Sequence, residues 1–183
     1  MESYLTSVIK QFEYYKSLGD KTINILSFDE LQNEIAKDSN SISIIVKHLV
    51  GNMLSRWTNF LIEDGEKEWR HRDQEFEDTY TSKEELLNNW NKGWNCLFEA
   101  LKSLSNDDLE RIVYIRNQGH IVTEAINRQL AHYSYHIGQI VFLGKIIKRE
   151  QWQSLSIPKG GSSKYNQEKF SAEKSRKHFT DDL

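Results

Sequence analysis

Residues 124–148 read EAINRQLAHYSYHIGQIVFLGKIIK, and the fold prediction starts from this stretch. Thr123 stands immediately before it, and threonine is one of the residue types that cap the free N–H groups of a helix N-terminus. The stretch therefore predicts a long helix over residues 124–148. Its two histidines, His132 and His136, are four residues apart. In a helix this spacing places both side chains on one face, one turn apart.

Apolar side chains recur at intervals of three and four residues in three further stretches upstream, which indicates amphipathic helices. The predicted helices cover residues 2–26, 41–63 and 82–104. Ser41 is one of three candidate N-terminal caps for the second, and Ser82 is one of two for the third. Four long helices predict an all-α fold, a four-helix bundle.

The connections between these helices suggest a topology. About 18 residues separate the second and third helices, whereas two to eight usually join antiparallel neighbours. A linker of this length can return along the bundle, so these two helices are expected to run parallel, giving an up-down-down-up bundle. The short β-prone runs 112–115 and 120–122 flank an Asn-Gln-Gly turn and predict a small hairpin between the third and fourth helices.

After residue 152 the chain is rich in Ser, Gly and Lys and loses its periodicity. We therefore divide it into a bundle, residues 1–152, and an irregular C-terminal tail, residues 153–183, that is partly packed on the bundle. Because the tail has few large apolar groups, no helix is expected in it before about residue 166. The step before Pro158 is expected to be extended, since the residue before a proline avoids helical dihedral angles.

Composition narrows the possible functions. The 183 residues carry 24 basic and 27 acidic side chains, a net charge of −3, so the basic surplus that phosphate-backbone binding needs is missing. No uninterrupted apolar run reaches the ~18 residues of a membrane span. Cys96 is the only cysteine and cannot form an internal disulfide. We expect a cytoplasmic protein with neither a nucleic-acid nor a membrane partner.

The helical pair His132 and His136 can reach one divalent ion, since a His–metal bond of ~2.0–2.1 Å suits two imidazoles one turn apart. A third histidine, His48, lies in the apolar segment 42–50 of the second helix. Two interpretations are open for these side chains: packed, hydrogen-bonded core residues, or ligands. Three histidines on inward helix faces favour a metal, because burying several polar rings without a partner is costly. Three protein ligands leave a fourth position for water or substrate, as in catalytic sites.

Three polar residues share the face of these histidines. Gln139, three residues after His136, is placed to orient a histidine, to bind a metal-bound water or to cap the pocket; we favour the first. Arg128, one turn before His132, is either a holder of a substrate carboxylate or phosphate or a solvated surface residue. Asn52, one turn after His48, is open to the same two interpretations.

The segment RQLAHYSYHIGQI, residues 128–140, together with His48 upstream, resembles the DinB/YfiT-like metalloenzyme superfamily. The likeness is closest to a DinB-like subfamily of unknown function, and it extends to Trp152 and the segment 155–161. The resemblance implies an up-down-down-up bundle, a divalent metal held by three histidines, with nickel or zinc as the main candidates, and a homodimer. On this pattern His48, His132 and His136 match the metal ligands.

Some relatives in that superfamily use a low-molecular-weight thiol as cosubstrate. The resemblance therefore implies a metal-dependent enzyme that activates a thiol or water, similar to thiol S-transferases, although no motif identifies a thiol site or a catalytic residue. The alternative is a non-catalytic metal-binding or stress-response interaction protein on the same bundle. Cys96 lies among core-like residues of the third predicted helix and is interpreted as packing, because a nucleophilic cysteine needs an accessible, electropositive setting.

Overall fold

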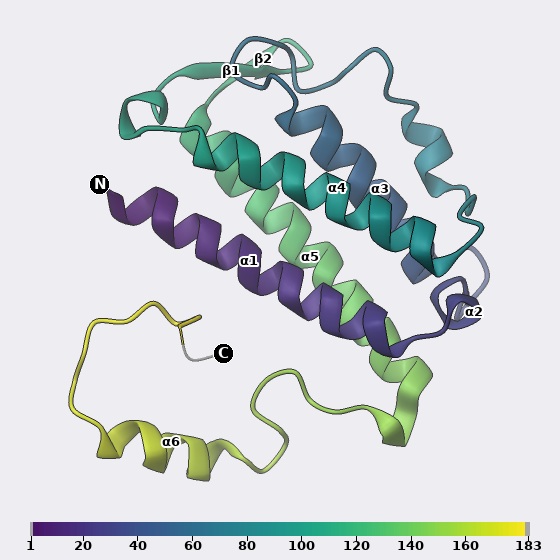
Figure 1. Cartoon of the computed structure of the whole chain (residues 1–183), viewed down its shortest axis with the longest axis vertical. Helices are drawn as coiled ribbons and strands as arrows, with labels where there is room; N and C mark the ends of the chain where they lie inside the picture. Colours follow the sequence, from purple (N-terminus) through teal and green to yellow (C-terminus); the bar gives the residue numbers. More distant parts are fainter. Residues whose placement is uncertain (1, 182–183) are drawn as a thin grey trace.

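The computed structural model describes residues 2–181, most of them helical (Figure 1). Four long helices form the bundle: α1 (Glu2–Ile25), α3 (Ile42–Trp57), α4 (Lys83–Lys102) and α5 (Val122–Lys148). The shorter elements are α2 (Phe28–Leu31), α6 (Ser162–Ser171), the 3-10 turns η1 (Arg72–Phe76), η2 (Asn106–Asp108) and η3 (Arg149–Gln151), and strands β1 (Ile112–Ile115) and β2 (Gln118–Ile121). The all-α bundle is confirmed.

The topology is also as predicted. Ser43, at the start of α3, donates a hydrogen bond to Asp78, just before α4. Thr58, at the end of α3, contacts Cys96 in the second half of α4. These contacts make α3 and α4 parallel neighbours. Figure 1 shows α1 and α5 starting at the opposite end of the bundle, so the order is up-down-down-up.

Buried aromatic side chains fix how α5 is turned about its own axis. Tyr133, Trp94 and Phe12 are fully buried, with the Trp94 ring centroid 6.0 Å from Tyr133 and 6.5 Å from Phe12. Such rings each bury roughly 150–250 Å² of surface and dominate core energetics. Because Tyr133 points into this core, its neighbour His132 is directed to the side of α5 that meets α3.

The capping prediction is right for two helices and wrong for the last. The Oγ atoms of Ser41 and Ser82 accept the first free N–H groups of α3 and α4, at 3.2 and 3.1 Å. Thr123, by contrast, donates its hydroxyl to the backbone of Leu109. Helix α5 begins two residues earlier than that cap would place it, and Glu124 accepts the backbone N–H of Ile121.

Helix α3 is shorter than predicted, because it ends at Trp57 rather than near residue 63. The chain turns away where Asn59 adopts a left-handed conformation, with φ of 50°. The hydroxyl of Ser55 and the guanidinium of Arg56 both donate to the backbone carbonyl of Gly65. These bonds fold residues 58–65 back against the last turn of α3, which a reading of apolar spacing does not detect.

The hairpin is present, but its turn begins one residue earlier than expected, at Arg116 and Asn117, and its second strand begins two residues earlier, at Gln118. Both residues have positive φ, 54° and 59°, which is the two-residue turn that suits the twist of a hairpin. The Asp64 carboxylate accepts the backbone N–H groups of both residues at 2.8 Å. This ties the hairpin to the α3–α4 linker and places Arg116 near the candidate site.

The tail is less irregular than predicted, since α6 begins at Ser162, where no helix was expected. Beyond α6 the chain reaches α1: His178 lies 3.0 Å from the Ser7 hydroxyl, and Asp181 pairs with Lys10 at 2.5 Å. The division of the chain at residue 152 stays a prediction. Among residues 2–181 none of the helices has the length and apolar character needed to cross a bilayer.

Candidate metal centre

Three histidine rings meet in the groove between α3 and α5. The Nε2 atom of His132 lies 3.3 Å from Nε2 of His48 and 3.1 Å from Nε2 of His136. One donor atom from each ring lies within 4.8 Å of the other two, so the three side chains could hold a metal ion. Nitrogens bound at ~2.0–2.1 Å to one tetrahedral ion are about 3.3–3.4 Å apart, close to the spacing seen here.

Hydrogen bonds on the far side of two rings set the protonation of the Nε2 atoms. His48 Nδ1 lies 2.9 Å from a carboxylate oxygen of Glu75, so that nitrogen carries the hydrogen. His136 Nδ1 lies 2.7 Å from Oε1 of Gln139, whose Nε2 donates to the Tyr135 hydroxyl. The Nε2 atoms of His48 and His136 therefore carry no hydrogen, and each has a lone pair available.

These two lone pairs both point at His132 Nε2, which can offer at most one hydrogen to one of them. An arrangement of converging lone pairs is unfavourable when nothing positive lies between them, and a divalent cation satisfies all three. The hydrogen bonds on the outer side of the rings thus leave the Nε2 atoms ready to bind a metal ion, and the residues present fit one.

Glu75 and Arg70 support His48 from behind. Glu75 lies in η1 and is buried. Its carboxylate accepts hydrogen bonds from Nε and Nη2 of Arg70, at 2.7 and 2.9 Å. Burial alone would raise the pKa of Glu75, but the hydrogen bonds from His48 and Arg70 outweigh it and lower that pKa. The ionised carboxylate orients the ring and makes it a stronger ligand. Phe76 completes the support by stacking on His48, with centroids 5.1 Å apart.

The histidines of α5 are held neutral by their surroundings. Burial, with smaller contributions from the neighbouring His136 and His48, lowers the pKa of His132 from 6.5 to about 3. Burial also lowers the pKa of His136, against the opposing effect of its bond to Gln139. Neutral imidazole is the form that binds metals, so the lowered pKa values favour the ligand form of both side chains.

This shift predicts that the metal-free protein loses stability in acid. Between pH 6.5 and 3 an unfolded chain holds a proton on His132 that the folded chain does not, so the free energy of unfolding falls as pH falls, by at most about 1.4 kcal/mol per pH unit. Urea unfolding of chelator-treated protein at pH 7.5 and 5.0 measures the effect. His132→Asn should flatten this dependence, and an equal pH dependence in the variant would contradict the assignment.

A cavity of about 210 Å³ opens beside the histidines. Its lining residues are His48, Asn52, Arg56, Arg70, Arg72, Arg116, Arg128, Gln129 and His132. The Oδ1 atom of Asn52 accepts a hydrogen bond from the Tyr133 hydroxyl, which in turn accepts one from the indole N–H of Trp57. Since Oδ1 is engaged, the Nδ2 donor is the part of Asn52 left for a molecule in the cavity.

The residues proposed from the sequence around the histidines are thus accounted for. Gln139 contacts His136, while Arg128 is exposed and lines the cavity. Glu75 and Arg70 were not among the residues proposed from the sequence. Glu75 is 27 residues from His48, in the α3–α4 linker, and no local signal marks it.

Comparison with protein families decides the classification. The family model described as "Protein of unknown function (DUF1572)" matches residues 1–161. The chain belongs to this family. DUF1572 is a DinB-like family, which agrees with the resemblance carried by residues 128–140 and His48. No curated protein matches the chain, and no solved structure matches it.

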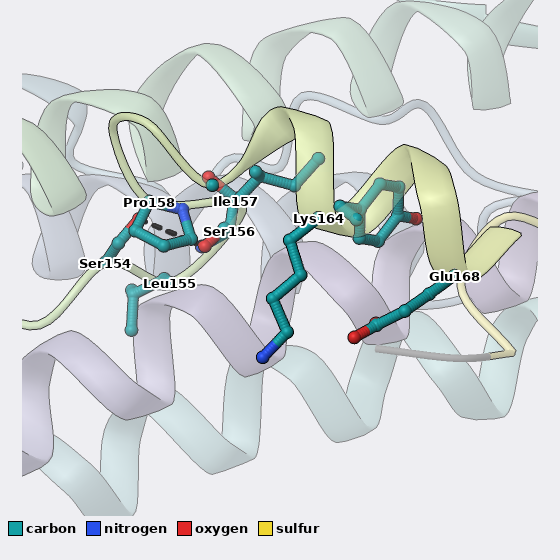
Figure 2. Close-up of a pocket in the computed structure, with 9 residues that line it drawn as sticks. Ser154, Leu155, Ser156, Ile157, Pro158, Lys164 and Glu168 are labelled. Atoms are coloured by element: carbon teal, nitrogen blue, oxygen red, sulfur yellow. Dashed lines mark hydrogen bonds between the residues drawn. The ribbon is translucent and has the colours of Figure 1, made fainter.

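The match to DUF1572 includes every residue of the centre described above and ends just before α6. A second cavity, of about 550 Å³, is formed by the tail alone, between Ser154 and Glu168 (Figure 2). Figure 2 shows Lys164 and Glu168 extending from α6 toward the same side. This cavity contains no histidine or cysteine, whereas His48 and His132 line the first one, so of these two cavities the first has the side chains that suit a metal ion.

Proposed function

We propose that this protein is a metal-dependent enzyme in which His48, His132 and His136 hold one divalent ion and the adjoining cavity holds the substrate. The observation that carries the proposal is the convergence of the Nε2 atoms on the wall of a cavity. When bound, such an ion lowers the pKa of a thiol or water molecule at its open position and supplies a nucleophile near neutral pH. This is the activity we assign, close to that of a thiol S-transferase.

The donor set favours nickel or zinc. Imidazole nitrogen suits both metals, and no carboxylate or thiolate joins the three histidines in the part of the chain that the structure describes. Burial raises the pKa of the Cys96 thiol, which lies against Thr58 and keeps its proton at neutral pH. Cys96 is therefore neither a ligand nor the nucleophile in this proposal.

The remaining polar residues take positioning roles. Glu75, held by Arg70, fixes the His48 ring, and Gln139, held by Tyr135, fixes the His136 ring. We assign the free Nδ2 group of Asn52 to the substrate, as a donor on the cavity wall.

A thiol-conjugation screen distinguishes this enzyme from the rival, a non-catalytic metal-binding protein. The metal-loaded full chain is incubated with 1-chloro-2,4-dinitrobenzene or monobromobimane and a panel of low-molecular-weight thiols, and in parallel with ester substrates for the water reaction. Turnover that disappears in His132→Ala supports the enzyme. Metal binding without turnover on either panel favours the interaction protein.

We also propose a homodimer that assembles through α5. Tyr135, Phe142 and Ile146 are exposed by 63%, 62% and 39% and form a stripe along this helix. Gly138 lies in the same region, with open space where a Cβ would be. An apolar stripe of this kind is typical of an interface. It borders the histidine face of α5, so a second copy would cover the edge of the metal centre.

Sedimentation equilibrium at micromolar concentration is expected to give about twice the chain mass of 21.6 kDa. Phe142→Glu should shift the protein to the single-chain mass, because a charge cannot be buried unpaired in an apolar interface. Ile62→Glu is the control: Ile62 is 81% exposed and lies in the α3–α4 linker, so this variant should remain dimeric. A wild-type protein of single-chain mass would rule out the dimer.

A further inference from the structure

Five arginines from separate parts of the chain meet around the cavity beside the histidines. Arg56 comes from α3, Arg70 and Arg72 from the α3–α4 linker and η1, Arg116 from the hairpin turn and Arg128 from α5. Five like charges around about 210 Å³ repel one another, so their gathering needs a compensating negative charge.

The acidic residues nearby compensate only part of this charge. Glu66 is shared by Arg56, Arg70 and Arg116, with nitrogen–oxygen distances of 3.1, 3.5 and 3.2 Å. Glu75 is occupied by Arg70 and His48. Two carboxylates thus face five guanidinium groups.

Arg72 and Arg128 account for most of the remaining positive charge. Neither forms an ion pair or a side-chain hydrogen bond with any residue in the range 2–181. Both are exposed, so they stand at the mouth of the cavity and can move without disturbing the core. A negatively charged molecule that enters the cavity can therefore bind these two guanidinium groups without breaking an existing ion pair.

Unpartnered polar atoms lie deeper in the wall. Nε of Arg56 and Oε1 of Gln129 are buried without a hydrogen-bond partner, and these side chains are only 8% and 3% exposed. A buried polar group without a partner costs about 1–3 kcal/mol, so native proteins rarely leave one unsatisfied. Turning the Gln129 amide by 180° would present Nε2 in place of Oε1, at no cost in existing hydrogen bonds. Both residues line the cavity, so each could then offer a donor there.

We propose that this cavity binds an oxyanion group, a phosphate or a carboxylate, carried by a small-molecule substrate. Planar guanidinium forks match the two oxygens of either group, and the buried Nε of Arg56, together with the Gln129 amide in its turned orientation, supplies further donors. His48 and His132 belong to both the metal centre and the cavity wall, so a group anchored here holds the rest of its molecule against the centre. That the bound molecule is a substrate rests on the proposed function; the anion site itself does not.

Calorimetric titration of the full chain tests the site with inorganic phosphate and with malonate as probes. The protein is first made metal-free, so that neither probe can bind through an ion. Arg72→Ala and Arg128→Ala remove exposed charges and leave the fold intact. Each is expected to weaken binding of the preferred probe at least tenfold, and the probe that binds more tightly identifies the group.

Arg111→Ala is the matched control. This arginine is exposed and, among residues 2–181, its side chain pairs with Asp108 alone, so its loss removes the same charge outside the cavity and should change affinity less than twofold. The proposal is overturned if neither probe binds wild type at millimolar concentration, or if Arg111→Ala weakens binding as much as the cavity variants do. Oxyanion binding by a protein that takes up no metal would retain the anion site and refute the proposed enzyme. Metal binding without oxyanion binding would refute the anion site and leave the proposed enzyme standing.

Discussion

His132→Ala is expected to lower the affinity of the protein for Zn²⁺ or Ni²⁺ by at least 100-fold. His132 Nε2 is the atom that both other ligands face, so its loss leaves two lone pairs with no third donor. Losing a direct ligand should exceed the 10–100-fold cost of losing an outer hydrogen-bond partner. We expect losses of the same order for His48→Ala and His136→Ala. Competition titration with a chromophoric chelator, on protein without a histidine tag, measures all three.

His71→Ala is the control for this series. His71 is exposed and precedes η1, close to the centre in sequence but absent from the group of ligands. It should bind metal as wild type does. Far-UV circular dichroism on each variant separates a lost ligand from a lost fold. Unchanged metal affinity in two of the three ligand variants would contradict the three-histidine centre.

Glu75→Gln is expected to weaken metal binding 10–100-fold while all three ligands remain. The neutral amide no longer holds the His48 Nδ1 hydrogen with a full negative charge, and its NH₂ group opposes the Arg70 guanidinium. The free energy of unfolding should also fall, since Arg70 is almost completely buried and loses its best partner. Glu77→Gln, an exposed neighbour, is the matched control and should change neither quantity. Equal metal affinity in both variants would show that Glu75 is only structural.

Gly51→Ala reaches the same carboxylate from the backbone of α3. A Cβ at position 51 would overlap the Glu75 carboxylate, which is pinned by Arg70 and His48 and cannot move aside without breaking those bonds. Alanine also favours the helix relative to glycine, so helix propensity alone predicts a more stable protein. A loss of metal affinity in Gly51→Ala would therefore be due to the displaced carboxylate, and unchanged affinity would contradict this packing.

The bundle could be predicted because its signals are local. Apolar residues three and four apart mark helix faces, and Ser41 and Ser82 mark helix starts, wherever the rest of the chain goes. The end of α3 could not be predicted, because it depends on hydrogen bonds from Ser55 and Arg56 to Gly65, across a loop. The hairpin turn was displaced for a similar reason, since Asp64 stabilises the left-handed Arg116 and Asn117.

The candidate site divides in the same way. His132 and His136 are one turn apart on a helix, and His48 lies on an inward face, so their meeting follows from helix geometry and topology. Glu75, Arg70 and Arg72 depend on the path of the α3–α4 linker, residues 58–82, most of which lies outside the long helices. A charged linker is usually solvated, and here it folds over the centre to supply its supporting charges.

X-ray absorption spectroscopy of the metal-loaded full chain tests directly whether the three histidines bind one ion. We expect one ion per chain, with three imidazole nitrogens at about 2.0–2.1 Å, lighter scatterers in any remaining position and no sulfur. The spectrum of His132→Ala, where metal can be loaded at all, should lose one imidazole. A sulfur neighbour at about 2.3 Å, which only Cys96 or a methionine could supply within the chain, or fewer than three imidazoles in the wild type, would contradict the three-histidine centre.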